Sequence, residues 1–184
     1  MVHNFHYEPD SKRILRLELF GMLFIVVLGS ALHFTFELSG NNPLVGAFSA
    51  VNESVWEHLK LAYWPALLYA IIEYRLLKGV PGFFLGKAIG IYLMPITIVA
   101  LFYTYRAFLE ESLIMDILIF ILAVIIGQLV GYKIMVWKEP SKVSLRISVL
   151  SLMLLGMVFI LFTYYTPHLS IFQDPISGGY GIWS

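Results

Sequence analysis

Five long apolar stretches follow one another along the chain, separated by short polar segments. Each is longer than the roughly 20 mainly apolar residues that an α-helix needs to cross a bilayer. They comprise residues 14–38, 55–77, 83–108, 113–136 and 143–165. The pattern predicts an all-α polytopic membrane protein, a single transmembrane domain over residues 1–184 with about five transmembrane helices.

Two other segments do not fit the pattern of spans and loops. Residues 39–49, "SGNNPLVGAFS", are too few to span and too apolar for an ordinary loop, so we expect a re-entrant or interfacial segment. Residues 166–184 are rich in Pro and Gly but also hold Ile, Phe, Tyr and Trp, which predicts an irregular, packed tail near the interface. The first apolar stretch is long for a cleaved signal peptide, and none is expected.

Composition supports a bilayer as the natural surroundings of this chain. Of its 184 residues, 59% are hydrophobic and 13% charged, whereas soluble domains carry about 25% charged residues. The formal net charge is zero, which gives no electrostatic basis for binding nucleic acid. Cysteine is absent, which excludes disulfides, thiolate metal sites and cysteine nucleophiles. The predicted partners are therefore the bilayer and a lipid or small-molecule ligand, while the oligomeric state is left open.

The basic residues predict the orientation. With a cytoplasmic N-terminus, the outer side holds only Lys60 and Arg106 of the 12 Lys and Arg residues. The others fall on the inner side: Lys12, Arg13, Arg16, Arg75, Lys78, Lys87, Lys133, Lys138, Lys142 and Arg146. This positive-inside bias predicts a multi-pass protein of the cell (inner) membrane, with its N-terminus cytoplasmic and its C-terminus extracytoplasmic.

Polar residues concentrate at the outer ends of the first two spans. His33 and Glu37 are four residues apart and share one helix face. The block "NESVWEHLK", residues 52–60, opens the second span. The connection is short, so the two helices should be antiparallel neighbours. Ionisable groups at this depth are costly when they face lipid, so we expect them to face protein or a water-filled cavity.

These residue types suit a catalytic zinc site, which takes three protein ligands and keeps a fourth position for water. The predicted ligands are His33, His58 and either Glu57 or His168, with Glu53 or Glu37 as the base. All of them are expected at one membrane level. The leading hypothesis is a metal-dependent hydrolase of a lipid or small amphiphile, with zinc as its cofactor.

Two alternatives use the same groups without a metal. In the first, His33 bonds to Glu57 and His58 to Glu37, which would only join the two helices. In the second, the cluster belongs to a non-enzymatic binding protein or a small transporter for cations, protons or an anionic lipid. No cofactor is needed in either case.

Asn52 and Lys60 are the candidate binding residues of the second helix. Asn52 or Ser54 could instead cap that helix. Lys60 could form an ion pair with Glu57 or Glu53, or bind an anionic headgroup.

Glu73 lies about 24 Å along the helix from Glu57, near the inner face. The simple interpretation is that its side chain extends toward Arg75 or Lys78. The transporter alternative makes Glu73 the end of a proton path from the outer carboxylates, with Gln128 and Tyr132 close by.

Three motifs carry a family resemblance: "HFTFELSGNNPLVGAFSAVNESVWEHLKLAYWP", "IIEYRLL" and "FQDPISGGYGI". Together, from Gly29 to Ile182, they resemble a family of small bacterial multi-span membrane proteins built on a domain of unknown function. The resemblance implies membrane location. The Glu, Asn, Ser and His residues at one membrane face are also similar in chemistry to the alkaline ceramidase and adiponectin-receptor zinc hydrolases. Those have seven spans and an HxxxH motif, which this sequence lacks.

Overall fold

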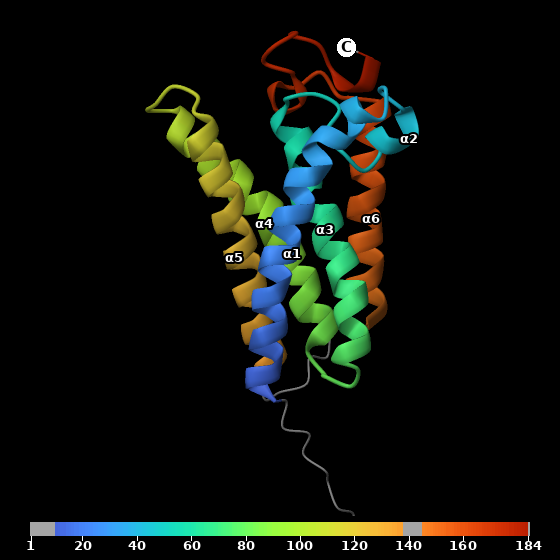
Figure 1. Ribbon diagram of the computed structural model, residues 1–184, viewed down its shortest axis with the longest axis vertical. Coiled ribbons are helices and arrows are strands. Elements are labelled where there is room, and N and C mark those ends of the chain that lie inside the picture. The colour runs from blue at the N-terminus through green and yellow to red at the C-terminus, as the bar shows by residue number, and fades with distance from the viewer. Residues whose placement is uncertain (1–9, 138–144, 184) are drawn as a thin grey trace, which may run out of the picture.

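Five long helices form an up-and-down bundle in the computed structural model, which describes residues 10–137 and 145–183 (Figure 1). They are α1 (Ser11–Leu38), α3 (Val55–Leu76), α4 (Phe83–Arg106), α5 (Leu113–Val136) and α6 (Leu145–Tyr164). No strand is found in the described part, so the all-α prediction is confirmed. Lys138 and Lys142 of the predicted basic side lie outside the described residues.

Four of these helices, α1, α4, α5 and α6, are long and apolar enough to cross a membrane. They leave large apolar side chains such as Leu23, Ile114 and Leu150 exposed, as lipid contact requires. The chain is thus a multi-pass membrane protein. The remaining long helix, α3, has 22 residues but carries charges near both ends, and its membrane crossing stays a prediction.

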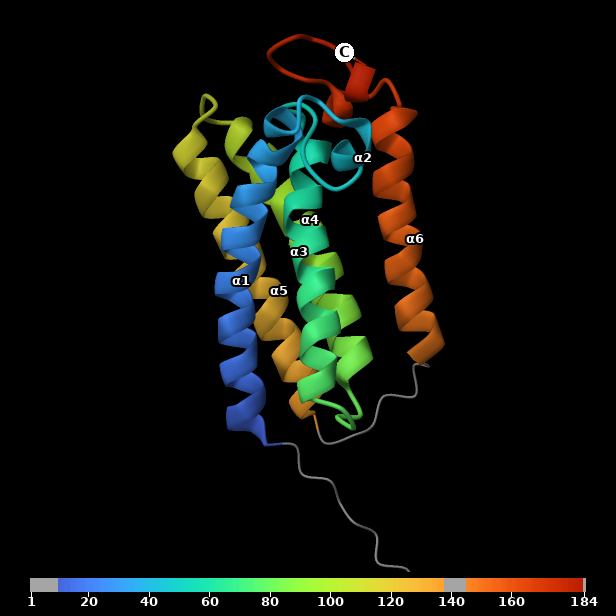
Figure 2. The same cartoon turned by 45° about the vertical axis from the view of Figure 1, so that its right-hand side comes forward.

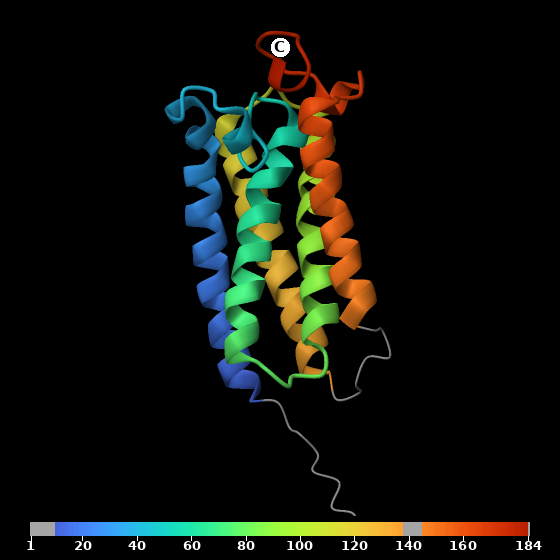
Figure 3. The same cartoon turned by 90° about the vertical axis from the view of Figure 1, so that its right-hand side faces the viewer.

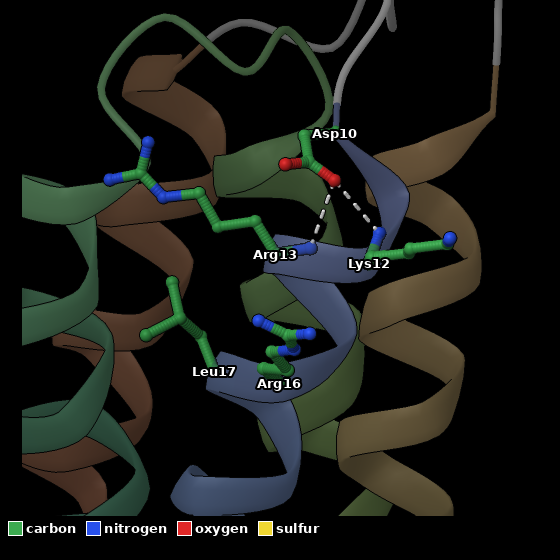
Figure 4. A pocket seen from close by; sticks show the side chains of 5 residues that line it. All are labelled: Asp10, Lys12, Arg13, Arg16 and Leu17. Carbon is green, nitrogen blue, oxygen red and sulfur yellow. Dashed lines mark hydrogen bonds between the residues drawn. The ribbon is translucent and has the colours of Figure 1, made fainter.

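Loops and short helices gather at one end of the bundle, which also carries the C-terminus and is called the tail end here (Figure 2). The tail end carries α2 (Pro43–Gly46), the α4–α5 connection, and the C-terminal residues with their short helices η1 (Ser170–Phe172) and η2 (Gly181–Trp183). Helix α1 begins at the opposite end of the bundle, which is called the basic end here. There Asp10 caps the helix by accepting hydrogen bonds from the N–H groups of Lys12 and Arg13, both at 3.1 Å. Beside it lies an open hollow of about 460 Å³ (Figure 4).

Helices α4 and α5 approach each other through glycines. A Cβ atom at Gly90 would lie 2.5 Å from the carbonyl oxygen of Gly127, and one at Gly127 would lie 2.6 Å from that of Gly90. Gly86 and Gly131 make a second pair one turn away. Because lipid gives no hydrophobic drive between helices, such small residues allow the backbone contact that holds them together.

Helix α3 packs against α1, α4 and α6 (Figure 3). Tyr63 is fully buried and donates a hydrogen bond to the Leu152 carbonyl on α6 at 2.6 Å. At the basic end, Glu73 pairs with Lys87 of α4. The interpretation that Glu73 extends toward Arg75 or Lys78 is therefore wrong: the carboxylate turns into the bundle, where a cation from the next helix meets it.

Candidate metal centre

The site lies at the tail end, where the last turns of α1 face the start of α3. His33 projects from α1, and its ring centroid lies 5.1 Å from that of His58 on α3. Glu53 precedes α3 by two residues. The position of Glu53 follows from the cap: Ser54 Oγ accepts the Glu57 N–H at 3.4 Å, and Asn52 Oδ1 accepts the Ser54 N–H at 3.0 Å. This turn leaves Glu53 outside the helix and directed toward α1.

Three ligand atoms converge between these elements. His33 Nε2 lies 3.8 Å from Glu53 Oε1, and His58 Nε2 lies 3.5 Å from Glu53 Oε2. All three ligand atoms lie within 4.8 Å of one another. A tetrahedral zinc ion with bonds of about 2.0–2.2 Å separates its ligand atoms by about 3.4 Å. The two N···O separations, which end on different oxygens of Glu53, are near that value and exceed the 2.7–3.2 Å of direct N–H···O hydrogen bonds.

The tautomer of His58 also suits a ligand. Its Nδ1 lies 2.9 Å from the Ser54 carbonyl oxygen. A carbonyl only accepts, so Nδ1 carries a proton, and Nε2 is the ring nitrogen that faces Glu53. Metal-binding histidines are commonly oriented in this way. The three side chains are 28%, 43% and 35% exposed for His33, Glu53 and His58, which leaves a side open for a fourth ligand.

Glu57 is not part of this cluster, which corrects the expectation that it could be a ligand together with His33 and His58. Glu57 Oε2 instead lies 2.5 Å from Lys60 Nζ and accepts the Val51 N–H at 3.1 Å. Successive helical residues point about 100° apart, so Glu57 and His58 face different neighbours. The alternative bond from His33 to Glu57 is likewise not formed.

Lys60 is enclosed by protein. Besides its ion pair with Glu57, which confirms one prediction, Nζ donates to the Gly46 carbonyl at 2.7 Å and to Thr163 Oγ1 at 2.8 Å. These contacts use all three of its protons. The side chain is fully buried, so an anionic headgroup has no access to it.

The other predicted residues lie apart from the three ligands. Glu37 is exposed on α1, one turn beyond His33. His168 is exposed and its ring contacts that of Tyr180 at an interplanar angle of 46°, with 4.6 Å between ring centroids. Asn52, besides its contact with Ser54, donates to the Gly181 carbonyl at 3.1 Å and so ties the tail to the start of α3. Among the described residues, the potential metal-binding group comprises His33, Glu53 and His58.

The tail supports the site through Asp174, a role that the sequence does not reveal. The Asp174 carboxylate accepts hydrogen bonds from the Ser177 hydroxyl at 2.5 Å and from the N–H groups of Ile176 and Ser177, and the Glu53 backbone lies near enough to favour its charged form. Burial raises the pKa of Asp174, but these hydrogen bonds together outweigh it and hold the pKa below its usual value. The carboxylate thus lies between the turn of the tail and the backbone that carries Glu53.

The helical bundle and its exposed apolar surface define a multi-pass membrane protein. Over residues 8–182 the chain matches a family of unknown function (DUF6512), and it belongs to that family. No curated protein and no solved structure matches it. The matched region includes His33, Glu53 and His58.

Proposed function

We propose that His33, Glu53 and His58 bind one zinc ion, and that the protein is a metal-dependent hydrolase of a lipid or small amphiphile. The observation that carries this proposal is the convergence of one possible ligand atom from each side chain to within 4.8 Å, with two N···O separations, 3.5 and 3.8 Å, near the spacing around tetrahedral zinc. Two histidines and one glutamate form a ligand set that hydrolytic zinc enzymes use, with water in the fourth position.

The zinc ion would supply an acidified water and polarise a carbonyl. In this assignment Glu53 is a ligand rather than the base. Glu37 then becomes the nearest remaining carboxylate along α1, about 6 Å beyond His33 on the same face. It is exposed, so it is free to take a proton from a water on the open side.

Apolar side chains around the site suit an amphiphilic substrate. Phe34 and Leu38 on α1 and Leu44 and Phe48 in the following segment are all exposed at the tail end. A substrate whose chain lies among lipids could therefore bring its polar linkage to the three ligands without leaving the membrane surface.

Charge placement supports an extracytoplasmic site in the cell (inner) membrane. Lys12, Arg13 and Arg16 lie at the basic end, as do Arg75 and Lys78. At the tail end Lys60 is neutralised by Glu57. The bias favours a cytoplasmic basic end. With 22 residues, α3 is about 33 Å long, enough for a fifth crossing, and its buried charges Glu57, Lys60 and Glu73 are paired inside the protein.

The proposal is tested by zinc content and hydrolysis measured on the same purified protein. Wild type should hold one zinc per chain, and His33→Ala, Glu53→Gln and His58→Ala should lose it. His168→Ala, which changes an exposed histidine at the same end, is the matched control and should retain zinc.

Cleavage of short-chain ester and amide amphiphiles should follow zinc content, whereas Glu37→Gln should keep zinc and lower turnover. Wild type that fails to bind added zinc would refute the metal site. Zinc without hydrolysis of any amphiphile would refute the enzymatic part.

A further inference from the structure

A second cluster of charges lies inside the bundle, toward the basic end. Glu18 on α1, Glu73 on α3 and Lys87 on α4 come from three different helices. Lys87 Nζ lies 2.5 Å from Glu18 Oε1 and also contacts Glu73 Oε2. Both glutamates are fully buried and Lys87 is 4% exposed, so these charges have lost their water.

The charges of this cluster do not balance. Two carboxylates and one ammonium leave a net charge of −1 if all three groups are ionised. The neighbouring polar groups do not compensate for it: Tyr69 on α3 donates its hydroxyl to the Leu17 carbonyl, and the Gln128 amide on α5 donates to the backbone of Glu18. Tyr69 also presents its ring 5.5 Å from Lys87 Nζ, which favours the cation rather than the anions. An uncompensated buried charge is costly, so the cluster favours binding one more positive charge.

The carboxylate oxygens show where that charge fits. Apart from the contacts with Lys87, Glu18 Oε2 and both Glu73 oxygens are buried without a hydrogen-bond partner among the described residues. Because Glu18 Oε1 and Glu73 Oε2 both contact Lys87 Nζ, the two carboxyl groups are neighbours that a hydrogen bond could join. Two carboxyl groups form such a bond only when one of them holds a proton.

We propose that Glu18 and Glu73 share one exchangeable proton beside a charged Lys87, which makes this cluster a proton-binding site within the membrane-spanning bundle. Its position allows exchange with the basic end. Glu73 lies three residues before the end of α3 and Lys87 four after the start of α4, about 5–6 Å along each helix. The inference does not depend on the metal centre, which lies at the other end.

The Glu57–Lys60 pair is a buried ion pair of the same protein in which the charges do balance. It is equally buried but has one carboxylate for one ammonium, and Thr163 donates to Glu57 Oε1 at 3.3 Å. That pair is neutral without any added proton. Glu57→Gln is therefore the matched control for a change at either carboxylate of the unbalanced cluster.

Infrared spectroscopy of the full-length protein in lipid bilayers tests the proposal, because a protonated carboxyl group has a carbonyl band that shifts in D₂O. At neutral pH the wild type should show such a band. Glu18→Gln and Glu73→Gln should each abolish it, since the one carboxylate left is balanced by Lys87. Glu57→Gln should keep it.

The wild-type spectrum alone can overturn the proposal, even if a variant does not fold. Absence of the band at neutral pH would show that both carboxyl groups are ionised. A band that appears only when sodium and potassium are removed would show that the cluster binds a metal cation in place of a proton. Persistence of the band in both folded single variants would place the proton elsewhere.

Discussion

Glu57 and His58 are adjacent in the chain and belong to separate clusters. Glu57 turns into the bundle and meets Lys60 at 2.5 Å, whereas His58 turns toward α1 and meets Glu53 at 3.5 Å. The first cluster is buried and balanced in charge, and the second is half exposed with ligand atoms free. A rotation of about 100° between adjacent residues thus separates a buried ion pair from a side chain of the proposed metal site.

Lys60→Met is expected to lower stability by about 3–5 kcal/mol, because it leaves Glu57 charged and buried without its partner. The double variant Lys60→Met/Glu57→Gln should recover much of this loss, since no charge is then left unpaired. Unfolding in detergent measures both. Lys78→Met, which removes an exposed lysine, is the control, and a loss no larger than the control's would contradict the account.

The helices themselves follow from hydrophobic pattern and length, and the observed bounds lie close to the predicted ranges. The similar depth of His33 and His58 in the membrane can also be predicted, because the position of a residue along a helix determines its depth. The position of Glu53 between the two histidines cannot be predicted in this way. Glu53 lies before α3, so helical periodicity does not determine its direction; the cap at Ser54 and the tail do.

The cluster of Glu18, Glu73 and Lys87 is not predicted from the sequence, for a different reason. Lys87 counts as an ordinary inner-side cation in the sequence, and Glu73 has nearer basic neighbours along its own helix. The sequence does place the three residues at a similar depth, because Glu18, Glu73 and Lys87 all lie within about two helical turns of the same end of the bundle. Which faces meet depends on helix rotation, and that is set by contacts such as the one between Gly90 and Gly127.

Gly127→Ala should destabilise the protein by about 1–3 kcal/mol, the usual range for overpacking. Its new Cβ atom would lie 2.6 Å from the Gly90 carbonyl oxygen, so α4 and α5 would have to separate. Thermal unfolding in detergent measures the effect. Leu122→Ala on the lipid-facing side of α5 is the control and should cost less; equal losses would argue against the close glycine contact.

Asp174→Asn should loosen the tail at neutral pH and weaken zinc binding about tenfold, since support of a ligand typically contributes 10–100-fold. The pKa of Asp174 is lowered in the fold, so its contribution is present above the ordinary value of 3.8 and is lost as pH falls through the lowered pKa. Hydrogen exchange of residues 170–183 measures the loosening. In wild type it should stay low until the pH falls below 3.8. Gln173→Ala, a change at an exposed neighbour, should leave zinc affinity unaltered; an equal loss there would remove the special role of Asp174.

Orientation can be tested with single cysteines, because the chain has none of its own. Ile176→Cys lies exposed in the tail and should react with a membrane-impermeant maleimide in intact cells. Lys78→Cys, exposed at the basic end, should react only after the membrane is opened. The reverse pattern would place the metal centre on the cytoplasmic side.

Anomalous scattering at the zinc edge, from crystals of the full-length protein grown with zinc, shows directly whether His33, Glu53 and His58 hold a zinc ion. We expect one strong peak at about 2.0–2.2 Å from His33 Nε2, His58 Nε2 and an oxygen of Glu53. This expectation would be contradicted by the absence of a peak there, with the two histidines bonded directly to Glu53, or by zinc bound instead at His168.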